Sequence, residues 1–188
     1  MDLLRAGAVS YNLLLHKKFT ISAGAKNEKI TFSFIFKPVN FYHLIGYHYL
    51  SDMQGFGKRA SRQEKEMALK RTLSNDIVLH KIAGSSFYNE IADRVAWFHR
   101  IDGLVAHIGG VFGNQKLVQF EQRGYSQIKS GYVLYEEYHD LQKVIMLFLT
   151  KDGNEIYQAE SFIVASNMNK LLNQKKFTIL GIASQFSR

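Results

Sequence analysis

The chain has 188 residues, of which 46% are hydrophobic and 21% are charged, a composition typical of a globular domain that excludes a disordered chain. Cysteine is absent, which excludes disulfides and thiolate chemistry and fits a reducing compartment. The net charge of +8 favours polyanionic partners, nucleic acid first and anionic membrane second.

The first residues lack the order of a signal peptide, which places a basic stretch before an apolar one. No apolar run approaches the length that crosses a bilayer. We therefore expect a cytoplasmic protein that does not engage a membrane.

The first predicted elements are a helix over residues 3–17 and two strands over 19–22 and 30–37, which pair as a hairpin. Pro38 cannot donate to a sheet ladder, so the second strand ends before it. Asn40 is the predicted N-cap of a short helix.

The short helix presents two different faces. Its helical spacing puts four residues on one face: Phe41, Leu44, Ile45 and His48. His43 lies on the opposite side. A rigid element that positions an imidazole can build a functional site or simply part of a core. His43 is the stronger functional candidate, because His48 falls among apolar neighbours.

Residues 51–62 are predicted to form an exposed basic loop that carries Lys58, Arg59 and Arg62. A charged helix is predicted over 61–74, and residues 77–82 fit either helix or strand. The longest predicted helix covers 87–108 and ends at a glycine pair. Its core face is marked by Ile91, Val95, Phe98, Ile101, Val105 and Ile108.

Strands dominate the rest of the chain. Their predicted ranges are 116–122, 131–138, 143–149, 156–164 and 177–183. A turn at 152–154 makes the two strands around it a hairpin, and 167–173 is a short helix or loop. Helices followed by strands indicate an α+β fold, with N-terminal helices packed on a C-terminal antiparallel sheet. Without a linker or repeat, we expect a single domain over residues 1–188.

Several chemistries find no support in the sequence. The histidines lack HExxH spacing, and without cysteine a structural zinc site is disfavoured, so we expect neither a metal nor a cofactor. There is no GxSxG motif for a serine hydrolase. The glycines before Lys58 are too closely spaced for a phosphate-binding loop.

Metal-independent cleavage of RNA is the remaining enzymatic option. It needs a base for the ribose 2′-hydroxyl, an acid for the leaving 5′-oxygen and cations for the phosphorane. Residues of suitable type at plausible sheet and helix ends are Lys37, His43, Arg94, Arg100, Lys129, Tyr132, Glu137 and Ser161. Each of them also fits an ordinary surface or core position.

The segment FYHLIGY at 41–47 resembles the F-x-H-L-x-G-[LY] signature of PBECR4, the fourth group of phage proteins similar to barnase, EndoU, colicin E5/D and RelE. Further similar segments lie at 91–95, 126–135, 144–149 and 160–162. The resemblance implies a BECR-like fold with an RNA-cleaving cleft on its sheet. It implies that His43 is the acid or base, that Ser161 contacts a phosphate or 2′-hydroxyl, and that Arg94 and Lys129 stabilise charge.

Two functions follow as hypotheses. The first is a metal-independent ribonuclease of a phage or mobile element, whose RNA-binding residues would be Lys37, Lys58, Arg59, Arg62 and Tyr132. The second is a non-catalytic module of a mobile element that binds nucleic acid or a protein. RNA or another nucleic acid is the expected partner, and an immunity or other partner protein is a further candidate. The sequence leaves the oligomeric state open.

Overall fold

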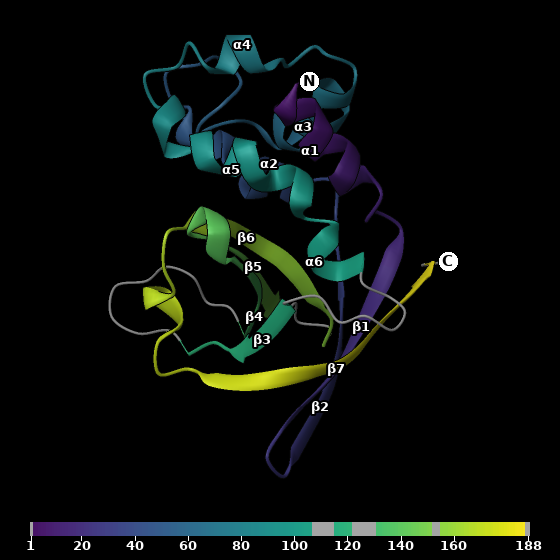
Figure 1. The fold of residues 1–188 in the computed structure, drawn as a ribbon. Helices are drawn as coiled ribbons and strands as arrows, with labels where there is room; N and C mark the ends of the chain where they lie inside the picture. Colours follow the sequence, from purple (N-terminus) through teal and green to yellow (C-terminus); the bar gives the residue numbers. More distant parts are fainter. Residues whose placement is uncertain (1, 107–114, 122–130, 152–154, 187–188) are drawn as a thin grey trace. The chain divides into compact units, whose positions relative to one another are not determined.

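A computed structural model describes residues 2–106, 115–121, 131–151 and 155–186 (Figure 1). The chain divides into two compact units. Unit 1 comprises Met1–Leu15 and Lys37–Asp102, and unit 2 comprises His16–Phe36 and Gly103–Arg188. None of the helices in the described residues combines the length and the apolar character that a membrane-spanning helix requires.

Unit 1 is helical in the residues that the structure describes. Its elements are α1 (Leu3–Asn12), α2 (Asn40–Leu44), the 3-10 helix η1 (Tyr47–Tyr49), α3 (Arg62–Leu73), α4 (Leu79–Ile82), η2 (Tyr88–Glu90), α5 (Ala92–Trp97) and η3 (Phe98–Arg100).

Side-chain caps explain where two of these helices begin. The Asp2 carboxylate accepts hydrogen bonds from the amides of Leu4 and Arg5 at the start of α1. At α3, Ser61 and Glu64 form a reciprocal capping box. The predicted cap at Asn40 is wrong: Asn40 is the first residue of α2, and its side chain accepts instead from the Lys37 amide.

The long helix predicted over 87–108 is also wrong. The described part of this segment is broken into η2, α5, η3 and the short helix α6 (Gly103–Ala106). Ile91, Val95, Phe98 and Ile101 are nevertheless buried as predicted. Short α and 3-10 turns place residues three or four apart on one face, so the apolar spacing is the same for a broken helix as for a continuous one.

Aromatic side chains form much of the core of unit 1. The Phe41 ring packs against Tyr11, Tyr47 and Phe98, with ring centroids 5.4–5.9 Å apart. All four residues are fully buried. The Tyr11 hydroxyl donates to the Lys37 carbonyl at 2.8 Å, which anchors the chain where it enters α2. This core sets the position of α2 and of the residues that follow it.

Unit 2 contains the strands. Its elements besides α6 are β1 (Lys17–Ala25), β2 (Glu28–Ile35), β3 (Gln115–Gln119), β4 (Tyr132–Tyr138), η4 (His139–Leu141), β5 (Lys143–Lys151), β6 (Tyr157–Ala165), η5 (Asn169–Leu171) and β7 (Lys175–Phe186). The predicted hairpins β1–β2 and β5–β6 are confirmed as antiparallel pairs. The predicted turn at 152–154 and the glycine pair at 109–110 lie outside the described residues.

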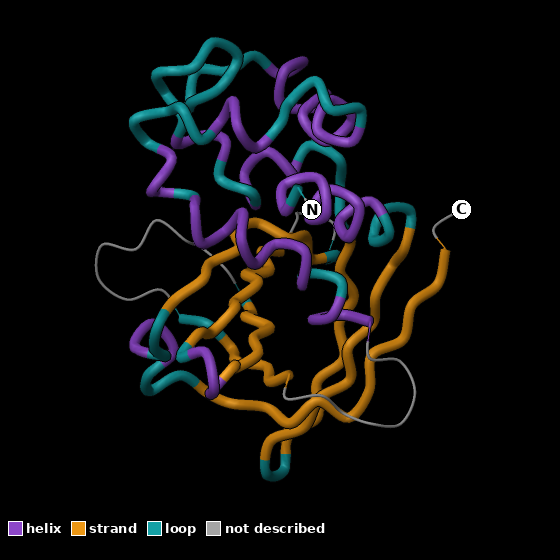
Figure 2. The backbone as a smooth tube through the Cα atoms, turned by 45° about the horizontal axis from the view of Figure 1, so that its top comes forward, coloured by secondary structure: helices purple, strands orange, loops and turns teal. Residues whose placement is uncertain are grey.

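The sheet is mixed and closes on itself in the order β1-β2-β6-β5-β4-β3-β7. Figure 2 draws its strands in orange. The prediction of an antiparallel, C-terminal sheet is therefore wrong in two respects. Strand β2 pairs with β6 in parallel, and the N-terminal hairpin β1–β2 belongs to the sheet. Closure occurs because β7 pairs first with β3 and then with β1, while β2 and β6 join over a short parallel pairing of Phe34 with Tyr157 and Ile35 with Gln158.

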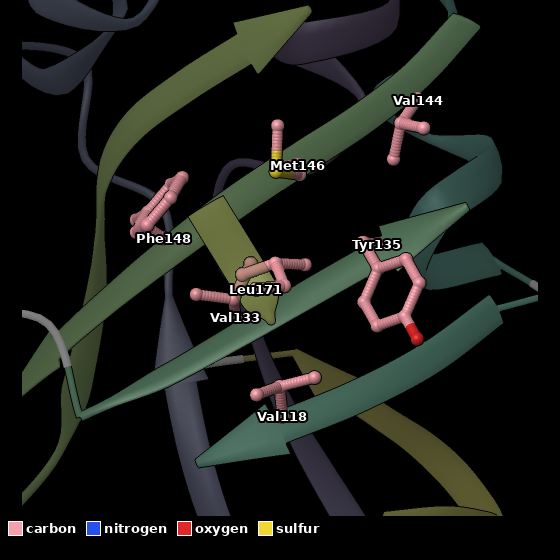
Figure 3. Packing of buried hydrophobic residues seen from close by; sticks show 7 residues of the cluster. All are labelled: Val118, Val133, Tyr135, Val144, Met146, Phe148 and Leu171. Carbon is pink, nitrogen blue, oxygen red and sulfur yellow. The ribbon is translucent and has the colours of Figure 1, made fainter. Parts of the chain in front are cut away.

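The core of unit 2 is formed by side chains that alternate between the two faces of its strands (Figure 3). Val133 and Tyr135 of β4 point to the same face as Met146 and Phe148 of β5, as residues two apart on a strand must. Leu171 from η5 packs on this cluster. On the opposite face, Leu134, Ile145 and Leu147 are also fully buried, so β4 and β5 are covered on both sides.

Candidate active site

A glycine interrupts the short helix that the sequence predicts after Asn40. Gly46 follows α2 with φ +97°, the left-handed conformation that commonly ends a helix, and η1 begins directly after it. This break changes which face each later residue occupies. Tyr47 becomes fully buried in place of His48, and the His48 ring lies 5.1 Å from the His43 ring, centroid to centroid.

Two buried tyrosines hold this turn in place. The Tyr42 hydroxyl donates to the Gly57 carbonyl at 2.9 Å. The Thr72 hydroxyl donates to the Ala68 carbonyl, so the Tyr47 hydroxyl, 2.9 Å from Thr72 Oγ1, is the donor of that bond. Burial raises the pKa of both tyrosines well above its usual range, so their hydroxyls stay protonated and keep donating.

The His43 side chain is exposed on α2, as the helical spacing predicts. Partial burial lowers the pKa of His43, and the nearby charge of Lys65 lowers it further. The imidazole is therefore neutral near pH 7 and has a lone pair that can accept a proton.

His48 is half-buried beside it. Burial lowers the pKa of His48 to about 4, with further contributions from His43, Arg94, Lys58 and Lys65. In the described part of the chain, no carboxylate contributes to the pKa shift of either histidine. The two rings thus sit among cations from α3, α5 and the 51–62 loop.

Arg94 of α5 contacts the backbone at His43 and the side chain of Tyr49. Its guanidinium approaches the His43 carbonyl and the Tyr49 hydroxyl, each at 3.5 Å, the outer limit for a hydrogen bond. It also lies over the Tyr49 ring, 5.1 Å from the centroid. Burial lowers the pKa of Arg94, but a guanidinium remains charged at any physiological pH.

Asp52 ties the segment after η1 to the segment before α5. Its carboxylate accepts from the Ser85 hydroxyl at 2.5 Å and from the amide and hydroxyl of Ser86 at 2.8 and 2.9 Å. The hydrogen bond from Ser85 is the main reason that the pKa of Asp52 is lowered. This contact links the chain segments that carry Tyr49 and Arg94.

Together these residues form a site suited to a phosphate. A guanidinium and two ammonium groups attract an anion, and two neutral imidazoles can donate or accept hydrogen bonds. A neutral imidazole can also take a proton from a hydroxyl. The described residues contain no group of three or more His, Asp or Glu side chains arranged to hold a metal ion.

The structure brings some predicted residues together and places others elsewhere. His43 and Arg94 meet in unit 1, and Lys58 of the same unit acts electrostatically on the adjacent His48. Ser161 lies on β6 and Tyr132 on β4, both in unit 2. The Tyr132 ring stacks on Phe32 at 4.3 Å, so one of its faces is already covered. Lys129 lies outside the described residues.

The remaining predicted RNA-binding residues belong to unit 1. Lys37 precedes α2 and is half-buried, whereas Arg59 is exposed in the predicted basic loop. Arg62 forms an ion pair with Glu66 at 2.7 Å on the surface of α3. Sequence reasoning ranked His48 below His43 and did not single out Tyr49 or Lys65. Gly46, inside the predicted helix, was the available signal, because an internal glycine can end a helix.

The model of the family described as phage-Barnase-EndoU-ColicinE5/D-RelE like nuclease4 (PBECR4) matches residues 3–185. The chain therefore belongs to this nuclease-like family, as the sequence resemblance indicated. Searches among curated proteins and among solved structures gave no match. The family relates the chain to nucleases and suggests a nucleic-acid substrate.

Proposed function

We propose that the chain is a metal-independent ribonuclease of a phage or mobile element and that His43 is its proton-transferring residue. The observation that carries this proposal is the placement of an exposed, neutral imidazole next to His48 and Arg94. Family membership and the net charge of +8 support an anionic nucleic-acid substrate.

In the proposed reaction, His43 takes the proton of a ribose 2′-hydroxyl, and that oxygen attacks the adjacent phosphorus. Arg94, with Lys58 and Lys65 nearby, stabilises the charge that develops on the phosphorane. The bond to the 5′-oxygen then breaks, and this oxygen regains the proton held on His43, directly or through water. The products are a 2′,3′-cyclic phosphate and a 5′-hydroxyl.

The test compares RNA cleavage in EDTA by the wild type, His43→Ala and His80→Ala. His80 is a matched control because it is an exposed histidine of unit 1, on α4. We expect cleavage by the wild type and His80→Ala and its loss in His43→Ala. Substrates with a 2′-deoxy sugar should stay intact, because they lack the attacking hydroxyl. Cleavage that requires Mg²⁺, or that survives in His43→Ala, would contradict the proposal.

The second candidate is a module that binds nucleic acid or protein without turnover. It is favoured by one observation: the lowered pKa of both histidines leaves neither as an imidazolium at neutral pH in the free protein. This candidate predicts that RNA binds with an affinity that falls steeply with salt while the RNA stays intact.

Other parts of the proposal rest on the family alone. We propose that Ser161 and Lys129 contact the substrate and that residues 1–188 act as one BECR-like domain, supported by the match over residues 3–185. A cytoplasmic location and an immunity protein as partner are consistent with a nuclease that must be restrained inside a cell.

A further inference from the structure

The two nitrogens of the His48 ring differ in their surroundings. Its Nδ1 is buried and has no hydrogen-bond partner among the described residues, although the ring as a whole is only half-buried. Nε2 is not among the buried polar atoms that lack a partner in the described residues, so we take it as the nitrogen that is open to a ligand. His48 faces its surroundings through one nitrogen.

The state of the buried nitrogen follows from the cost of leaving it unpaired. A neutral imidazole carries its proton on one nitrogen and a lone pair on the other. A buried N–H without an acceptor is rare in proteins, and an unsatisfied acceptor is better tolerated. A lone pair on Nδ1 is thus the less costly choice, which puts the proton on Nε2, at the exposed edge.

The surroundings disfavour a second proton on the ring. Within the described part of the chain, the charged or titratable groups that act electrostatically on His48 are His43 from α2, Arg94 from α5, Lys58 from the loop before α3 and Lys65 from α3. The adjacent Tyr49 ring lies 4.1 Å away, centroid to centroid. Each of the cations opposes an imidazolium, so His48 carries a single proton in the free protein.

We propose that His48 donates a hydrogen bond from Nε2–H, as a neutral imidazole, to a non-bridging oxygen of the phosphodiester. This inference rests on the proposed function and divides the work of the two histidines: His43 moves the proton, and His48 stabilises charge. A neutral imidazole gains from such a role because it does not change its protonation during the reaction and needs no reorganisation.

The first test is independent of catalysis. Two-bond ¹⁵N–¹H spectra of the free protein near pH 7 report which nitrogen of His48 carries the proton. We expect the Nε2–H form, and we expect its signals to shift when inorganic phosphate is added, whereas those of His80 stay unchanged. A proton on Nδ1, an imidazolium near pH 7, or no response to phosphate would overturn the proposal.

The second test compares His48→Ala with His48→Gln in RNA cleavage. Loss of one preorganised donor to developing charge typically lowers kcat by about 100-fold. We expect that loss in His48→Ala, with at least about a tenfold recovery in His48→Gln, whose side-chain amide can still donate. Equal losses in the two variants, or no loss in either, would overturn the role of His48. If the wild type itself leaves RNA intact, the proposed function fails, and the spectra still decide the state of His48.

Discussion

The imidazole rings of His43 and His48 lie 5.1 Å apart, centroid to centroid, on the two sides of Gly46. A continuous helix would turn residues five apart away from each other by more than a right angle. The left-handed conformation of the glycine between them makes the pair possible. The Arg94 guanidinium lies beside the pair and approaches the His43 carbonyl. Predictions about this site therefore concern the pair, its cation and the glycine.

An anion bound at the site should raise the pKa of His43. The pKa is lowered by partial burial and by Lys65, and a phosphate nearby would favour the imidazolium and offset both. By linkage, phosphate should bind more tightly as the pH falls through the titration of His43. Proton NMR titrations with and without phosphate measure the shift, with His80 as the internal reference. If the pKa of His43 is the same with and without phosphate, the proposal of an anion site at these residues is contradicted.

Arg94→Ala should lower kcat/KM for RNA cleavage by about 100-fold, because it removes the guanidinium that faces the His43 carbonyl. Arg94→Lys should recover only part of this loss, since an ammonium lacks the planar fork. Arg100→Ala is the matched control: Arg100 also lies over an aromatic ring, Trp97, at 5.1 Å in the same unit. Equal decreases of kcat/KM in Arg94→Ala and Arg100→Ala would mean that the effect comes from the lower net positive charge and not from the position of Arg94.

Gly46→Ala should destabilise the protein by about 2 kcal/mol or more, because an alanine is strained at a positive φ and its Cβ would overlap its neighbours. That Cβ would lie 2.5 Å from Ile91 Cγ2 and 3.4 Å from Arg94 Cδ. Gly103→Ala is the control, since a Cβ there meets nothing within 4 Å. Urea denaturation gives the free energies of unfolding. Similar free energies of unfolding for the two variants would show that the packing around Gly46 can accommodate a Cβ.

Stability should fall with acid in a way that depends on His48. Its pKa is about 4 in the folded protein and 6.5 as the ordinary value, so the unfolded chain binds more protons between these pH values. The free energy of unfolding therefore decreases as the pH falls from 6.5 to 4. At pH 5 the expected loss relative to pH 7 is about 1 kcal/mol, after a reduction for the ring's partial exposure to water.

His48→Gln isolates that contribution. The variant cannot titrate, so its loss of stability between pH 7 and pH 5 should be about 1 kcal/mol smaller than that of the wild type. Carboxylates and His43 titrate in both proteins, and their effects cancel in the comparison. Denaturant titrations at the two pH values provide the measurement. Parallel losses in the two proteins would mean that the pKa of His48 is close to its ordinary value in the folded state.

Local signals in the sequence predicted much of the secondary structure. Ser61 and the charged pattern after it correspond to α3, and the β-branched and aromatic runs correspond to the strands of unit 2. The exposure of His43 followed from its position opposite Phe41 and Leu44. Such features depend on neighbours three or four residues away along a helix, or two residues away along a strand. They can therefore be predicted from the sequence alone.

The sequence by itself thus determined most of the element types, the exposed His43 and, through the FYHLIGY segment, the family. Only the tertiary structure decided that His48 joins His43 and that β2 pairs with β6 to help close the sheet. The physical reason is the same in both cases. The φ of Gly46 is positive where Ile91 leaves no room for a Cβ, and the β2–β6 pair joins strands more than a hundred residues apart. Packing between segments that are distant in the sequence selects both the conformation of Gly46 and the β2–β6 pairing. The hydrophobic periodicity of the sequence does not predict such packing.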